Sequence, residues 1–76
     1  PIFMIHTFDD FVPVLGTTNL FEMAKKSGVS TELHIFDAGG HGYGLRHDPA
    51  FPVTKWHHLC SDWLKRAGWI DPNNEP

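Results

Sequence analysis

The chain has 76 residues, of which 41% are hydrophobic and 13% aromatic, and its formal net charge at pH 7 is −3. This length allows one small domain at most, and the apolar share excludes a disordered segment. The negative charge argues against nucleic acid and membrane surfaces as partners, the single cysteine excludes an internal disulfide, and no apolar run is long enough for a membrane span.

The first expected element is a strand over residues 2–5. Its sequence, IFMI, is apolar without alternation, which is typical of a strand covered on both faces in a parallel sheet. We expect the strand to stop at His6. A loop over residues 8–16 then holds two neighbouring carboxylates, Asp9 and Asp10.

A helix is expected next, ending at Gly28. Thr17, Thr18 and Asn19 are all favourable N-cap residues, and Asn19 with Glu22 has the spacing of a capping box. One apolar stripe follows the helical period: Leu20, Met23 and Ala24.

A second strand is predicted over residues 31–36, because polar and apolar residues alternate there up to Ile35. A glycine-rich loop follows and runs as far as Pro52. The last helix has apolar residues at i, i+3, i+4, i+7, i+8 and i+11, namely Trp56, Leu59, Cys60, Trp63, Leu64 and Ala67. Gly68 ends this helix, and residues 71–76 are expected to form an exposed tail.

The order strand, helix, strand, helix predicts an α/β fold with two parallel neighbouring strands and a right-handed crossover. Two strands and two helices cannot cover both faces of a sheet, and an isolated parallel pair is not a stable unit. The chain also starts at Pro1 inside an apolar run. We therefore interpret residues 1–70 as a segment of a larger α/β domain, cut from a longer protein.

Candidate acid-base groups follow both strands. Asp9 and Asp10 come after the first strand, and His41 lies between glycines after the second. Because parallel strands end at the same edge of a sheet, a carboxylate and an imidazole are expected to meet there. Such a pair can fix the tautomer of the histidine and stabilise its protonated form. The glycines allow positive φ angles that aim the ring. Ordinary turn residues remain the alternative interpretation.

Two motifs carry a resemblance to a known family. Residues 1–14, PIFMIHTFDDFVPV, contain an acidic D-x-x-V-P loop, and GGHGYGLR follows about thirty residues later, before a helix that ends in WLKRAGW. Together they resemble the C-terminal part of an α/β hydrolase. The esterases that cleave acetyl and related esters, many of them on plant carbohydrate, are the most similar group. Dienelactone hydrolases and prolyl oligopeptidases are also similar.

The resemblance implies a Ser-Asp-His triad in that chain order. The family's acid maps onto Asp9, because Val12 and Pro13 follow it at the family's spacing of three and four residues. Asp10 is the fallback, because the interval from His6 to Asp9 is one residue shorter than in many relatives.

The family's histidine maps onto His41. The nucleophile motif G-x-S-x-G does not occur in the 76 residues, and Ser27, Ser30 and Ser61 lie on or beside the expected helices. The resemblance therefore implies that the nucleophile and the oxyanion hole lie upstream of Pro1.

No metal or organic cofactor is expected. His47 and Asp48 lie near His41, but the only thiol falls on the buried helix stripe, so a tetrahedral zinc site is not indicated. His57 and His58 are adjacent on a helix and should point about 100° apart, so we do not expect them to bind one ion together.

Five other residues are expected near the site. We expect His6 to be a packed residue at its base. Tyr43 and Arg46 either border the substrate pocket or pack the loop, and both interpretations stay open. Phe8 and Phe11 either shield the acid from water or are covered by segments outside this chain.

The predicted function is serine-dependent hydrolysis of short acyl esters. His41 would be the base and Asp9 the acid, a small-molecule ester the substrate, and the rest of the fold a necessary partner. The chain by itself is expected to be inactive. Three alternatives stay open: a serine peptidase of the prolyl-oligopeptidase type, a non-catalytic α/β-hydrolase-like binding protein, and a self-standing binding module.

Overall fold

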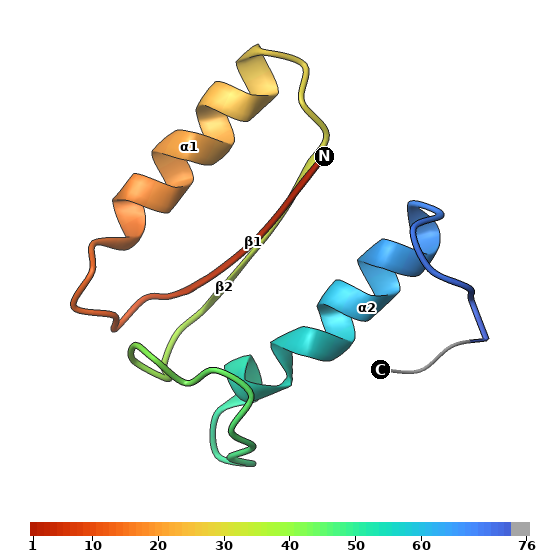
Figure 1. Cartoon of the computed structure of the whole chain (residues 1–76). Coiled ribbons are helices and arrows are strands. Elements are labelled where there is room, and N and C mark those ends of the chain that lie inside the picture. The colour runs from red at the N-terminus through yellow and green to blue at the C-terminus, as the bar shows by residue number, and fades with distance from the viewer. Residues whose placement is uncertain (74–76) are drawn as a thin grey trace.

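The computed structural model describes residues 1–73. Its elements in chain order are strand β1 (Ile2–Thr7), helix α1 (Val14–Lys26), strand β2 (Thr31–Phe36), the short 3₁₀ helix η1 (Pro52–Lys55) and helix α2 (Trp56–Arg66). The strands form a parallel pair, with Ile2 opposite Thr31 and Thr7 opposite Phe36. This pair lies between α1 and α2 (Figure 1). The predicted β-α-β-α order and the parallel pairing are confirmed.

Strand β1 is two residues longer than its apolar run predicts, because His6 and Thr7 continue the pairing with β2. Both side chains are buried, at 9% and 0% exposure. Each is hydrogen-bonded, which removes the cost of burying a polar group at the end of a strand.

Helix α1 begins at Val14, so the expected start near Thr17–Asn19 is wrong. The N-cap is Pro13, and no side chain caps the helix. The φ angle of Pro13 is −58°, close to the value that its ring imposes, and its ψ of 121° places it just outside the helix. The hydroxyls that suggested caps have other partners: that of Thr17 meets His6, and that of Thr18 donates to the carbonyl of Leu15.

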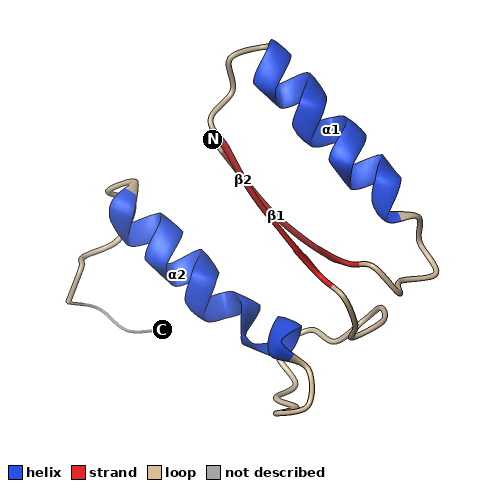
Figure 2. Ribbon diagram, turned by 180° about the vertical axis from the view of Figure 1, so that it is seen from behind, coloured by secondary structure: helices blue, strands red, loops and turns tan. Residues whose placement is uncertain are grey.

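Helix α2 covers the other face of the strand pair (Figure 2). The ring of Trp63 packs against Phe3 of β1, with 5.6 Å between the ring centroids. The helix begins at Trp56, as its stripe predicts, directly after η1. The indole nitrogen of Trp56 donates to the carbonyl of Gly44 at 2.7 Å, so α2 also holds the loop that follows β2.

The core within residues 1–73 is small. Ala24 and Val53 are its buried hydrophobic residues. In the α1 stripe only Ala24 is buried, whereas Leu20 is 47% and Met23 63% exposed, so most of this apolar stripe is uncovered within residues 1–73. Phe8, Phe11, Leu45 and Trp69 are also largely exposed.

The end of the chain was predicted to be an exposed tail over residues 71–76. Residues 71–73 are exposed. Residues 74–76 of this prediction lie outside the described part. Neither of the two α-helices within residues 1–73 has the length and apolar character of a membrane span.

Candidate active site

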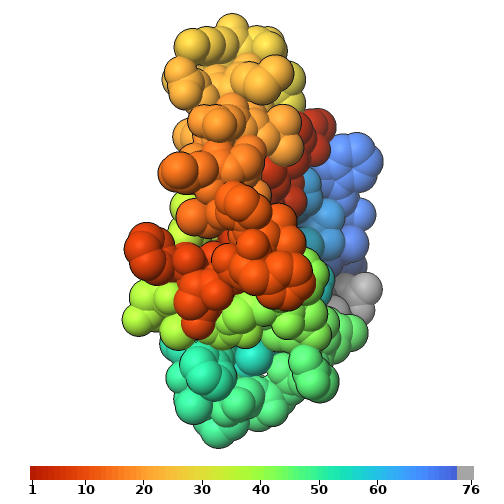
Figure 3. Space-filling view, turned by 90° about the vertical axis from the view of Figure 1, so that its left-hand side faces the viewer, coloured from red at the N-terminus to blue at the C-terminus, as the bar shows by residue number. Residues whose placement is uncertain are grey.

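The loops that follow β1 and β2 lie against each other at the carboxyl ends of the strands. In the space-filling view the orange-red loop after β1 touches the green loop after β2, below α1 (Figure 3). The N–H of Phe8 donates to the carbonyl of Phe36 at 2.7 Å, and the hydroxyl of Thr7 donates to the carbonyl of Gly40 at 2.6 Å. The sheet therefore fixes both loops relative to each other.

His41 contacts a carboxylate across these loops, and that carboxylate belongs to Asp10. The Nδ1 atom of His41 is 3.1 Å from Oδ1 and 3.2 Å from Oδ2 of Asp10. An ionised carboxylate only accepts hydrogen bonds, so Nδ1 carries the proton in this contact. In the neutral ring Nε2 is then free to take up a proton. Within residues 1–73 it has no hydrogen-bond partner.

Asp9, the expected partner of His41, lies elsewhere. Its Oδ1 accepts the N–H of Gly40 at 2.8 Å, and its Oδ2 accepts the N–H of Gly39 at 3.3 Å. The N–H of Gly40 is the main cause that lowers the pKa of Asp9 below its usual value. The expected contact between Asp9 and His41 is therefore wrong, and the fallback residue Asp10 makes it. The tight turn after β1 turns the two neighbouring carboxylates toward different partners.

Asp10 is held by its own loop as well as by His41. The N–H of Val12 donates to Oδ1 at 2.9 Å, a local turn closed by the carboxylate. Burial of the side chain, which is 8% exposed, works against ionisation. The hydrogen bonds from Val12 and His41 and the nearby imidazoles outweigh this, so the pKa of Asp10 lies below its usual value.

His6 was expected as a packed residue at the base of the site, and it is buried there. Its contacts go further than packing. Nε2 lies 3.2 Å from Oδ2 of Asp10 and 3.0 Å from the carbonyl oxygen of Val12, and Nδ1 lies 2.7 Å from the hydroxyl of Thr17. The interval from His6, which made Asp10 the fallback, is the sequence signal that agrees with this geometry, whereas the spacing to Val12 and Pro13 favoured Asp9.

His41 itself is half exposed. Its side chain has 50% of its surface accessible, and the ring of Phe11 packs beside it with 4.7 Å between the centroids. Phe11 is 81% exposed, so it flanks the imidazole without covering it. The ring of His41 is thus accessible to a small molecule.

The glycines of the loop adopt the positive φ angles that were predicted: Gly39, Gly40, Gly42 and Gly44. Gly39 is also required by packing. A Cβ atom there would lie 2.4 Å from Cγ1 of Val53 and 3.3 Å from Cγ2 of Thr7, and both side chains are fully buried. The backbone before His41 is therefore pressed against the core.

A hollow of about 370 Å³ lies beside this loop, and its lining includes Tyr43, Arg46 and Phe51. The guanidinium of Arg46 donates to the carbonyl of Gly42 at 2.8 Å, so Arg46 both packs the loop and borders the hollow. Burial and the charge of Asp10 raise the pKa of Tyr43. Tyr43 therefore stays a neutral phenol beside the hollow.

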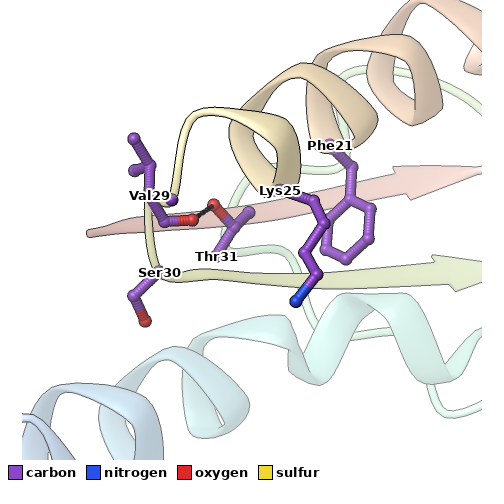
Figure 4. A pocket seen from close by; sticks show the side chains of 6 residues that line it. Phe21, Lys25, Val29, Ser30 and Thr31 are labelled. Carbon is purple, nitrogen blue, oxygen red and sulfur yellow. Dashed lines mark hydrogen bonds between the residues drawn. The ribbon is translucent and has the colours of Figure 1, made fainter.

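A second hollow, of about 520 Å³, lies at the amino end of β2, away from His41. Its lining is Phe21, Lys25, Gly28, Val29, Ser30 and Thr31 (Figure 4). The hydroxyl of Thr31 donates to the carbonyl of Val29 at 3.0 Å. This lining holds a lysine and no carboxylate or imidazole, so the hollow itself offers no acid-base pair.

Metal-ligating side chains do not cluster in the described part of the chain: no group of three or more His, Cys, Asp or Glu is placed to hold an ion. The rings of His57 and His58 lie side by side, with 4.2 Å between their centroids, and do not diverge as their positions on a helix predicted. Burial raises the pKa of the Cys60 thiol, with a further contribution from Glu32.

Two solved structures are similar to the chain. The crystal structure of an acetyl ester-xyloside bifunctional hydrolase from Caldicellulosiruptor lactoaceticus is 43% identical, with a TM-score of 0.84 over 92% of this chain and 26% of that one. An alpha/beta hydrolase enzyme from a Medee basin deep-sea metagenome library is 28% identical, with a TM-score of 0.73 over 87% of this chain and 32% of that one.

No family model matches the chain, and no curated protein does. The chain spans between about a quarter and a third of the two hydrolases that it matches. Both align with nearly all of its elements, and the parallel strand pair between two helices has the architecture of that fold. The chain is therefore a β-α-β-α portion of an α/β hydrolase.

Proposed function

We propose that the protein is a serine-dependent carboxylic ester hydrolase in which this chain supplies the acid and the base of the triad. His41 is the general base and Asp10 is the acid that orients it. The contact between Nδ1 of His41 and the carboxylate of Asp10 carries the proposal, because it leaves Nε2 unprotonated and accessible.

The nucleophile comes from a part of the protein outside these 76 residues. A serine hydroxyl there gives its proton to Nε2 of His41 as its oxygen attacks the ester carbonyl. The imidazolium is stabilised by Asp10 and returns the proton to the departing alcohol, which leaves an acyl-enzyme. Water then attacks the acyl group, with His41 again as the general base. The carboxylic acid product is released and the serine hydroxyl is restored.

The substrates that we propose are short acyl esters, including those on plant carbohydrate. One similar structure is named as an acetyl ester-xyloside hydrolase, which supports both parts of this class. The hollow beside Tyr43 and Arg46 adjoins the loop of His41 and offers polar groups for the alcohol portion.

Hydrolysis of p-nitrophenyl acetate tests the proposal. We would compare the complete protein, the 76-residue chain and the variant His41→Ala of each, with His58→Ala as the matched control. His58 is exposed on α2 and belongs to the same residue type.

Activity in the complete protein that is lost with His41→Ala and kept with His58→Ala supports a serine esterase, and the separate chain should show none. A complete protein without activity, or with activity indifferent to His41, would favour the non-catalytic alternative. Cleavage of peptide substrates in preference to esters would favour the peptidase.

A further inference from the structure

We infer that His6 is a positioning residue for this reaction, which holds the carboxylate of Asp10 in place through a close contact of its Nε2 atom and through the hydrogen bond that this atom makes to the loop of Asp10. The inference rests on the proposed function, because it concerns the acid of that triad. His6 does not contact His41, so any effect on the reaction passes through Asp10.

The contacts of His6 account for both ring nitrogens. Nε2 is hydrogen-bonded to the carbonyl oxygen of Val12 at 3.0 Å, and Oδ2 of Asp10 lies 3.2 Å from the same nitrogen. Both partners only accept hydrogen bonds, so Nε2 carries a proton. Nδ1 then accepts from the hydroxyl of Thr17 at 2.7 Å when the ring is neutral.

These contacts close a small ring of interactions between β1 and the loop that follows it. His6 on β1 is hydrogen-bonded to the Val12 carbonyl, and the Val12 N–H donates to Oδ1 of Asp10 at 2.9 Å. Oδ1 of Asp10 is therefore held by its own loop and Oδ2 lies against the imidazole of His6, before His41 is considered. The side chain of Asp10 is 8% exposed and that of His6 10%, so water cannot readily replace either contact.

The consequence for the reaction follows from geometry. Asp10 must present an oxygen to Nδ1 of His41 in the orientation that keeps Nε2 free for the substrate. If the imidazole of His6 is lost, its contact with Asp10 and its bond to Val12 are lost with it, so the carboxylate can rotate about its side-chain bonds and the imidazole of His41 is less well oriented. Displacement of a catalytic group by about 1 Å can reduce the rate about a hundredfold. We expect the loss in kcat and not in KM, because His6 does not contact substrate.

Two amide variants of the complete protein separate this role from packing. In His6→Gln the amide nitrogen can take the place of Nε2 and keep the bond to Val12 and the contact with Asp10. In His6→Asn it can take only the place of Nδ1, beside Thr17. Both side chains are polar and neutral, so they share the effects of replacing a buried ring.

The measurements are kcat and KM for p-nitrophenyl acetate, thermal unfolding, and the proton NMR signal of Nδ1–H in His41. We expect His6→Asn to lower kcat about tenfold to a hundredfold with KM unchanged and to weaken the NMR signal. His6→Gln should stay within a few-fold of the wild type and keep the signal. Equal kcat values for the two variants would overturn the inference, as would a drop in kcat that follows thermal stability alone.

The same assay includes Asp10→Asn and His41→Ala. If neither lowers kcat, the proposed function is wrong. If both abolish activity while His6→Asn and His6→Gln behave alike, the triad stands and only the role of His6 is wrong.

Discussion

Asp9 and Asp10 are neighbours in the chain but belong to two different networks. Asp9 is exposed and accepts two backbone N–H groups from the loop after β2. Asp10 is nearly buried and contacts the imidazoles of His6 and His41. One carboxylate holds the backbone of the histidine loop, and the other holds the ring of the histidine.

The roles of the two aspartates thus depend on their bonding partners and not on the residue type: one supports the loop backbone, and the other contacts the proposed base. A backbone N–H offers a fixed donor whose position depends on the loop, so Asp9 determines where the loop lies. An imidazole gains and loses a proton during the proposed reaction, so Asp10 affects the charge that develops on His41. The two aspartates should therefore respond differently to the same substitution.

The largest expected effect is that of His41→Ala in the complete protein. Removing the base of such a triad lowers kcat by about four to six orders of magnitude, because proton transfer from the nucleophile is lost. Steady-state hydrolysis of p-nitrophenyl acetate measures this. The folded state should be unaffected, since the side chain is half exposed. A loss below tenfold would contradict the assignment of the base.

Asp10→Asn comes next, with an expected loss in kcat of about four orders of magnitude. The amide can present its N–H₂ to Nδ1 of His41, which favours the tautomer with the proton on Nε2. That tautomer cannot accept the serine proton. Steady-state kinetics of Asp10→Asn and Asp9→Asn measured side by side test this. A larger loss in kcat for Asp9→Asn than for Asp10→Asn would show that Asp9 is the acid that orients His41.

Gly39→Ala tests the loop backbone on which both networks depend. The new Cβ would approach Val53 to 2.4 Å at a φ angle of 137°, so we expect the free energy of unfolding to fall by about 1–3 kcal/mol. Urea unfolding measures this, and hydrolysis should also decline as the loop shifts.

Gly16→Ala is the matched control for this change. Gly16 lies in α1 with nothing within 4 Å of its added Cβ, so the same substitution should raise stability by about 0.5–1 kcal/mol. Equal destabilisation of the two variants would contradict the inference that packing against Val53 requires a glycine at position 39.

Asp9→Asn should have a smaller effect on activity, about tenfold or less. The amide oxygen still accepts the N–H of Gly40, while the weaker bond to Gly39 is lost. Steady-state kinetics measure the change. Faster hydrogen exchange at Gly39 and Gly40 should accompany it, with exchange at the Val12 amide unchanged.

The smallest effect is a dependence on pH. The pKa of Asp9 in the folded state lies below its ordinary value of 3.8, so its ionised form contributes stability that is fully present above that value. This stability is lost as the pH falls through the lowered pKa. The difference in unfolding midpoint between wild type and Asp9→Asn should therefore shrink as the pH falls below about 3.8, and a difference that grows in acid would contradict this sign.

Much of the fold follows from local pattern. The apolar run of β1, the alternation in β2 and the helical stripe of α2 each predict the right element, and their order predicts the parallel pair. The predicted start of α1 is wrong because Thr17 and Asn19 suit a cap in isolation, whereas the helix begins at Val14, directly after Pro13 and without a side-chain cap. The preference of threonine for N-cap positions does not reveal that the Thr17 hydroxyl bonds to His6 of β1.

The site was predictable up to the choice between two carboxylates. Parallel strands must bring the acidic loop and His41 to one edge, and they do. Which aspartate meets the imidazole depends on a turn in which the N–H of Asp10 reaches the carbonyl of Thr7 at 3.3 Å. In this turn the side chains of Asp9 and Asp10 point in different directions, and the sequence spacing to Val12 and Pro13 does not determine those directions.

The pairing register of the strands has a further consequence for length variation. Each strand has six residues, and they pair without offset from Ile2 with Thr31 to Thr7 with Phe36. One inserted residue in either strand would move its loop by about 3.3 Å and exchange the two faces of every following side chain. Homologous chains should therefore differ in length between Leu45 and Phe51, where the loop is exposed, and keep both strands at constant length.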